Sequence, residues 1–236
     1  MKGMKMKKRP LPSGPFEELS WPSLLEAGVV KPGTMPRIHG YSVDEDLCRH
    51  YSFGEVLFLS LTGDLPTREK GILFENVLIR LCPVSPADGP VHAALLSRAA
   101  GATSTGTLMV GLIGLCERAR HTVSKHLPLL EATRLGKPLP PGFEAKTERD
   151  HIVGKELNEL WPEEPGPPME GLTAEASCVM ALSACGLCEE WQLEVALVAA
   201  GLGVLPAEAQ RAPAGRLTDY PMNLPPFRYE ERDEDV

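Results

Sequence analysis

The sequence predicts an all-α fold, and its composition is the first observation that does so. Apolar residues make up 43% of the 236 residues, whereas aromatic residues make up only 6%. The apolar residues are mostly Leu, Ala and Val, in runs with few β-branched neighbours. Such runs favour packed helices over strands. Helix-capping patterns and apolar side chains at helical spacing are the second and third observations.

The first two helices are predicted to form a hairpin. Ser52 and Glu55 have the spacing of a capping box, and Gly63 supplies a left-handed stop eleven residues after Ser52. The second helix is predicted to begin after Thr67. The second helix has one apolar face with spacing i, i+4 and i+7, formed by Phe74, Leu78 and Leu81.

Apolar periodicity and helix breakers predict the remaining helices. They cover residues 92–100, a longer stretch running towards Lys125, residues 152–161, and a pair at 173–185 and 189–200 separated by Gly186. The Pro- and Gly-rich stretch at 136–143 interrupts this series, so we expect a hinge there. No apolar run in the sequence is expected to be long enough to cross a bilayer.

These elements predict the following organisation. A loosely ordered arm covers 1–33, the first part of a large helical domain 34–135, a smaller helical region 136–190, a closing helix that returns to the large domain 191–217, and an acidic Pro-rich tail 218–236.

Charge and cysteine content restrict the possible environments. The formal net charge of -8 lies partly in the tail, so no nucleic-acid surface is expected. The basic start of the chain is followed by prolines rather than an apolar stretch, which predicts no export signal and a cytoplasmic protein. Six scattered cysteines then predict reduced thiols, and the Cys185–Cys188 spacing alone is a weak redox or metal signal.

Four segments resemble short members of the citrate synthase and citryl-CoA lyase family: Ile38–Leu47, Tyr51–Thr67, Asp88–His92 and Leu95–Ala100. The resemblance implies a large helical domain with a smaller helical domain hinged onto it, in a two-fold dimer. It also implies that a coenzyme A thioester is a possible substrate, because family members join or split an acyl-CoA and an oxo acid. No metal and no tightly bound cofactor are expected.

The chemistry of this family uses a carboxylate base and two histidines. His121 lies near the place of the first histidine, but the glycines of the family motif are missing there. In Pro141-Gly-Phe-Glu-Ala145, Ala145 stands at the place of the second histidine. Glu175 stands at the place of the catalytic aspartate. The resemblance therefore implies His121 and Glu175 as catalytic candidates; the alternatives are an exposed helical histidine and a Glu that stabilises a helix N-terminus.

The substrate-binding candidates come from the third and fourth matching segments. His92 and Asp88 occupy the region that binds the oxo acid in relatives, with Asp88 in place of a ligand-binding histidine. A carboxylate there would repel a dicarboxylate. Arg98 is a candidate anion contact, or else a surface charge of its helix. A metal site formed by Cys116, His121 and His126 is rejected, because five-residue spacing spreads them around a helix.

Three hypotheses follow. The first is a catalytically impaired or auxiliary family member that dimerises with itself or with a complete relative. The second is an active enzyme that forms or cleaves a C–C bond between an acyl-CoA and an altered oxo acid. The third is a helical binding module unrelated to acyl-CoA chemistry, against which the match over 38–67 argues.

Overall fold

The computed structural model describes residues 26–162 and 166–211. Most of the predicted arm, the end of the predicted closing helix and the predicted acidic tail lie outside these residues. The chain divides into two compact units, Met1–Arg49 and His50–Val236, which are described separately.

The first unit contains a small antiparallel sheet that the sequence analysis did not predict. Its strands, in sheet order, are β1 (Val30–Lys31), β2 (Arg37–Ile38) and β3 (Tyr41–Ser42). His39 and Gly40 form the turn between β2 and β3 with φ angles of 46° and 89°, a left-handed pair that produces a tight hairpin. A π-helical segment, η1 (Val43–Leu47), and the short helix α1 (Cys48–His50) follow.

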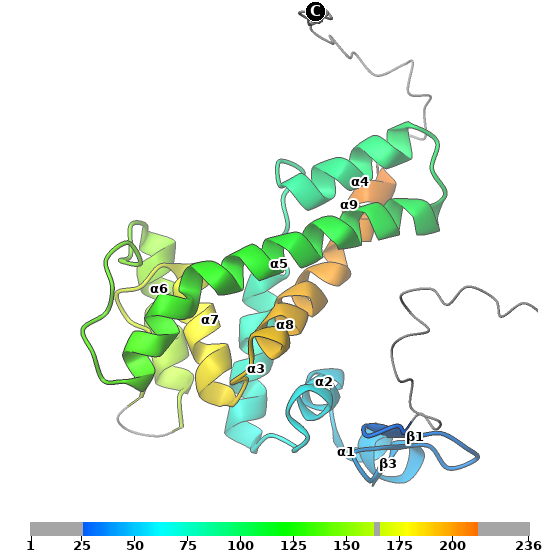
Figure 1. The fold of residues 1–236 in the computed structure, drawn as a ribbon, viewed down its shortest axis with the longest axis horizontal. Coiled ribbons are helices and arrows are strands. Elements are labelled where there is room, and N and C mark those ends of the chain that lie inside the picture. The colour runs from blue at the N-terminus through cyan, green and yellow to red at the C-terminus, as the bar shows by residue number, and fades with distance from the viewer. Residues whose placement is uncertain (1–25, 163–165, 212–236) are drawn as a thin grey trace, which may run out of the picture. The chain divides into compact units, whose positions relative to one another are not determined.

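The second unit is helical, so the all-α prediction is confirmed (Figure 1). Its helices are α2 (Phe53–Thr62), α3 (Arg68–Leu81), α4 (Gly89–Ala99), α5 (Ser104–Arg134), α6 (Glu148–Leu160), α7 (Ala174–Cys185), α8 (Glu190–Leu202) and α9 (Val204–Arg211). The predicted capping box at Ser52 and Glu55 is present, and Gly63 ends α2 with a φ of 88°.

Helix α5 is longer than predicted, because it continues past Lys125 to Arg134 with Pro128 inside it. A proline removes one backbone hydrogen bond and disfavours a helix interior. Leu129 and Leu130, directly after Pro128, are buried in the main core. Their burial favours continuation of the helix and offsets the local cost of the proline.

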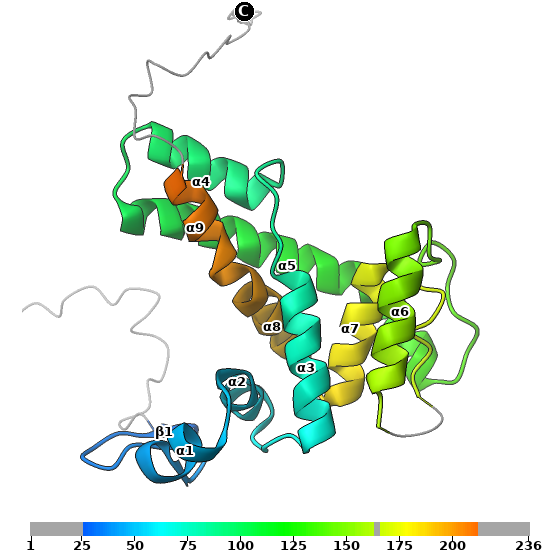
Figure 2. The same cartoon turned by 180° about the vertical axis from the view of Figure 1, so that it is seen from behind.

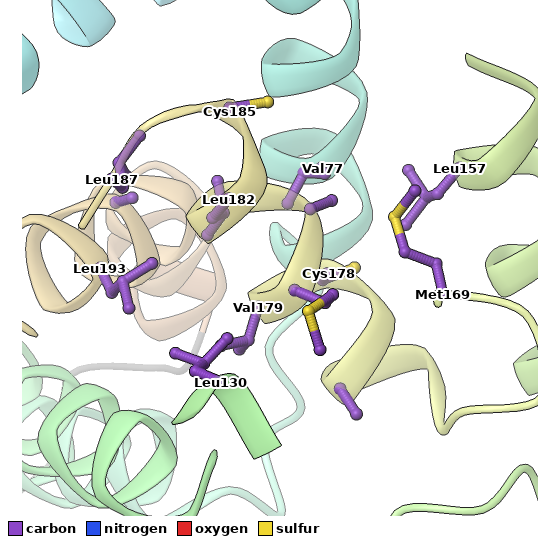
Figure 3. Packing of buried hydrophobic residues seen from close by; sticks show 14 of the residues in the cluster. Val77, Leu130, Leu157, Met169, Cys178, Val179, Leu182, Cys185, Leu187 and Leu193 are labelled. Carbon is purple, nitrogen blue, oxygen red and sulfur yellow. The ribbon is translucent and has the colours of Figure 1, made fainter. Parts of the chain in front are cut away.

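Helix α7 lies at the centre of the main core. Every residue from Ala176 to Leu182 is buried, as expected of a helix that is covered on all sides. Figure 3 shows its side chains among those of neighbouring elements: Val77 of α3, Leu130 of α5, Leu157 of α6 and Leu193 of α8. In Figure 2, α3 lies beside α7 and α8.

A second, smaller cluster joins α4, α5 and α9, which lie together in Figure 1. Its buried members are Val84, Val91, Ala94, Leu115, Leu205 and Ala209. Helix α5 therefore contributes to both clusters. The predicted division at 136–143 stays a prediction; residues on both sides of this stretch, such as Leu129 and Leu157, share the main core.

The expectation that no apolar stretch is long enough to cross a bilayer needs correction. Helices α8 and α9 follow each other directly, and together Glu190–Arg211 is long and apolar enough to span a membrane by length and composition alone. The periodic pattern over 189–200 and the predicted closing helix over 191–217 are both covered by this stretch, and Gly203, between α8 and α9, keeps helical dihedral angles (φ -75°, ψ -42°). In the most apolar window, 44% is buried within the protein.

Candidate functional site

A cavity of about 340 Å³ lies within the helical unit. Helices α3, α5, α6, α7 and α8 and the segment between α3 and α4 contribute to its wall. Helix α5 supplies one stripe of the wall at helical spacing: Leu115, Arg118, Ala119 and Thr122. Five lining residues carry charge: Arg80, Asp88, Arg118, Arg149 and Glu175.

Two of the three arginines are held by carboxylates. Arg118 Nη1 donates to Asp88 Oδ2 at 3.2 Å, and the same oxygen accepts from the backbone N–H of Ser85 at 2.9 Å. Arg80 forms an ion pair with Glu156 of α6. Arg149 forms no ion pair with any residue in 26–162 or 166–211. The cavity wall therefore offers guanidinium groups suited to a carboxylate or phosphate ligand.

Glu175 lies in the first turn of α7, and local hydrogen bonds fix the start of this helix. Thr173 caps it by accepting from the backbone N–H of Ala176 at 3.3 Å. Lys125 Nζ of α5 donates to Glu175 Oε2 at 2.9 Å, with about half of each side chain exposed. The helix dipole and Lys125 both interact favourably with a negative charge at this position.

His126 is fully buried beside Glu175. Its Nδ1 lies 2.7 Å from the carbonyl oxygen of Thr122, which can only accept, so Nδ1 carries the proton. Nε2 is then the free ring nitrogen, 3.8 Å from Glu175 Oε2 and without a hydrogen-bond partner among the described residues. Burial lowers the pKa of His126, against smaller opposing effects of the Thr122 hydrogen bond and the Glu175 charge.

The structure brings together two of the five predicted site residues. Asp88 and Glu175 both line the cavity. His121 is exposed on α5, and His92 is exposed on α4. Arg98 is half-buried on α4, with a buried Nε that has no partner among the described residues. None of the last three lines the cavity, and the roles of all five stay predictions.

The two loops that the family resemblance links to catalysis lie side by side. The backbone N–H of Ala145 donates to Gly171 O at 2.8 Å, and that of Thr173 donates to Phe143 O at 2.7 Å. Ala145 thus lies next to the start of α7. Glu170 is exposed and directly precedes Gly171 in this loop.

Sequence reasoning missed His126 and the three cavity arginines. A signal for His126 existed, because the buried positions Ala119, Thr122, Val123 and Leu130 of α5 define a face on which His126 falls and His121 does not. The arginines come from α3, α5 and α6, and their convergence depends on tertiary packing. No cluster of three or more potential metal ligands among His, Cys, Asp and Glu occurs in the described part of the chain.

Comparison with protein-family models finds no match, and no curated protein matches the sequence. Solved structures do match. Citryl-CoA lyase from Hydrogenobacter thermophilus shares the fold with a TM-score of 0.65 and 18% identity, over 90% of this chain and 98% of that chain. ATP citrate lyase from Methanothrix soehngenii, in complex with citrate and coenzyme A, has a TM-score of 0.65 and 14% identity over 100% of this chain and 48% of that one.

A variant of Methanosaeta concilii ATP citrate lyase, in complex with (3S)-citryl-CoA, matches with a TM-score of 0.56 and 14% identity over 96% of this chain and 47% of that chain. This chain therefore spans about half the length of the ATP citrate lyases and almost all of the citryl-CoA lyase. The helical fold is therefore a citrate synthase-like fold. The neighbours that share this fold are citryl-CoA lyase and ATP citrate lyase, in agreement with the sequence resemblance.

Proposed function

We propose that this chain is a divergent member of the citrate synthase and citryl-CoA lyase family that binds a carboxylate ligand or a coenzyme A thioester in the cavity. We propose further that it is catalytically impaired or auxiliary, and that it forms a homodimer or pairs with a complete relative. One observation carries the proposal: none of the described residues that line the cavity is a histidine.

The chemistry of the family explains why this observation matters. Enolising a thioester and polarising a ketone need donors that face the reacting oxygens at hydrogen-bond distance. Ala145 has only a methyl group where the second imidazole is expected, and His121 is exposed outside the cavity. Arg80, Arg118 and Arg149 supply positive charge for binding, so ligand binding is better supported than turnover.

A second candidate is an active lyase or synthase with an altered oxo acid, and the His126–Glu175 pair favours it. A carboxylate 3.8 Å from an unpartnered imidazole nitrogen forms a proton-transfer pair that a small side-chain movement brings within hydrogen-bond distance. The half-exposed Glu175 carboxylate lines the cavity. In this case Glu175 is the base and His126 accepts its proton.

Turnover measurements distinguish the two candidates. The purified chain is assayed alone, and together with a complete family member from the same organism, for CoA release from acetyl-CoA with oxaloacetate and for citryl-CoA cleavage. The auxiliary role predicts no turnover by the chain alone, acetyl-CoA binding by calorimetry, and co-elution with the relative. Turnover by the chain alone that is abolished by Glu175→Gln contradicts this role and supports the second candidate.

Two matched variants locate the carboxylate that matters in that second case. Glu170→Gln tests the loop residue before Gly171, and Glu69→Gln, exposed in the first turn of α3, is the control that should leave any activity unchanged. Loss of turnover in Glu170→Gln but not in Glu175→Gln would assign the base to the loop.

A further inference from the structure

The charges around the cavity set a limit on the charge of its ligand. Three guanidinium groups and two carboxylates line the wall, which leaves one positive charge. The ion-pair partners just outside the lining, Glu156 and Lys125, carry opposite charges and leave this balance unchanged. A ligand with one carboxylate neutralises the site, whereas a second or third carboxylate adds uncompensated negative charge.

Asp88 is the residue that creates this limit. Its Oδ2 is held by two hydrogen bonds, from the Ser85 backbone N–H at 2.9 Å and from Arg118 at 3.2 Å. The side chain is therefore anchored at the N-terminal end of α4, and it occupies the guanidinium group that a ligand carboxylate would otherwise bind. The half-buried setting of this pair reduces screening of the Asp88 charge by water.

Arg149 is the lining arginine that forms no ion pair within the described ranges, whereas Arg80 and Arg118 each have a carboxylate partner. It lies in the first turn of α6, between Glu148 and Asp150, and the Asp150 carboxylate is already engaged by the backbone N–H groups of Lys146 and Thr147. One carboxylate bound at Arg149 therefore satisfies the remaining charge.

We propose that the cavity selects a small oxo acid with a single carboxylate over dicarboxylates and tricarboxylates, and that Asp88 is the specificity-determining residue. The inference rests on the proposed function, because it concerns the ligand of the same cavity. Asp88→Asn keeps the size of the side chain and an oxygen that accepts from Ser85, but removes the charge that excludes further carboxylates.

The test is titration calorimetry of the full chain at fixed ionic strength with pyruvate, oxaloacetate and citrate, which carry one, two and three carboxylates. The wild type should bind pyruvate at least about tenfold more tightly than citrate, and Asp88→Asn should shift this ratio towards oxaloacetate and citrate by about tenfold. Arg149→Gln should abolish pyruvate binding. Asp64→Asn, exposed between α2 and α3, is the control for the loss of one negative charge.

Each contrary outcome has a distinct meaning. A wild-type protein that binds citrate as tightly as pyruvate overturns the selectivity and leaves the proposed function intact. An unchanged ratio in Asp88→Asn, and in Asp88→Ser should the first variant not fold by circular dichroism, overturns the role of Asp88. If neither the wild type nor any folded variant binds a carboxylate or acetyl-CoA, both this inference and the proposed function fail.

Discussion

Asp150 Oδ1 accepts a hydrogen bond from the backbone N–H of Ala174 at 2.7 Å, and this bond ties the start of α6 to the start of α7. The other oxygen of Asp150 accepts from the backbone N–H groups of Lys146 and Thr147 at 3.0 and 2.9 Å. Ala174 directly precedes Glu175, so the Asp150 carboxylate positions the turn that carries one of the two acidic residues of the cavity wall.

Replacing Asp150 with Asn should therefore destabilise the protein by about 1–3 kcal/mol, because an amide cannot accept at all these positions and carries no charge. Urea unfolding followed by circular dichroism measures this loss. Glu148→Gln, a neighbouring acidic residue of the same helix turn, should change the stability much less. Equal losses in the two variants would mean that the shared hydrogen bonds are unimportant.

The stabilisation by Asp150 should also depend on pH. Backbone hydrogen bonds, first from Ala174 and then from Lys146, hold the pKa of Asp150 well below its usual range. The folded pKa is depressed, so the stabilisation is complete above the unfolded value of about 3.9 and is lost as the pH falls towards the folded value. The difference between wild type and Asp150→Asn should be constant from pH 7 to 5 and shrink below pH 4.

His126 predicts a second, separate pH dependence. Burial lowers its folded pKa, so the unfolded chain takes up a proton first as the pH falls below about 6.5. Stability should thus be greater at pH 7.5 than at pH 5.5. His126→Gln should flatten this difference, whereas His121→Gln, on the exposed side of α5, should retain it. A flat wild-type profile would contradict the burial of a neutral imidazole.

More of the fold than of the candidate site could be predicted from the sequence. Ser52 with Glu55, and Gly63, act through neighbours in the chain, and their local chemistry is sufficient to place the ends of α2. The continuation of α5 past Pro128 was missed, because local propensity argues against it and only burial of Leu129 and Leu130 in the distant core explains it.

The candidate site was harder to predict than the fold, because it is formed by contacts between segments that are distant in the sequence. Arg118 and Asp88 are thirty positions apart and Lys125 and Glu175 fifty, and no periodic pattern links such pairs. Glu175 was found because the resemblance supplied its place. His126 was overlooked because its spacing from His121 was used only to reject a metal site.

Close packing at Gly154 gives a further prediction. A Cβ added there would lie 2.6 Å from the backbone oxygen of Met169, so Gly154→Ala should force α6 away from this segment. We expect a loss of about 1–3 kcal/mol in unfolding free energy. Gly89→Ala is the matched control in the first turn of α4, because nothing lies within 4 Å of its added Cβ; a similar loss there would argue against the close contact.

The cysteines should fall into two reactivity classes. Burial raises the pKa of Cys178 and of Cys185 to about 12, so neither forms the reactive thiolate at neutral pH. Cys48, Cys116 and Cys188 are exposed. Mass spectrometry after brief iodoacetamide treatment at pH 8 should show labelling of the exposed three, and of Cys178 and Cys185 only after unfolding. Rapid labelling of Cys178 in the native protein would contradict its position in the core.

The stripe of α5 along the cavity has a consequence for how this protein can diversify. Leu115, Arg118 and Thr122 are fixed at intervals set by the helix pitch of about 5.4 Å, and both ends of the helix are anchored in different clusters. The α5 backbone therefore holds these side chains at a fixed spacing along the cavity wall. Substitutions at these positions change the chemical groups that face the cavity without moving the backbone. Changes of ligand are therefore expected to arise by substitution along α5 rather than by remodelling of its path.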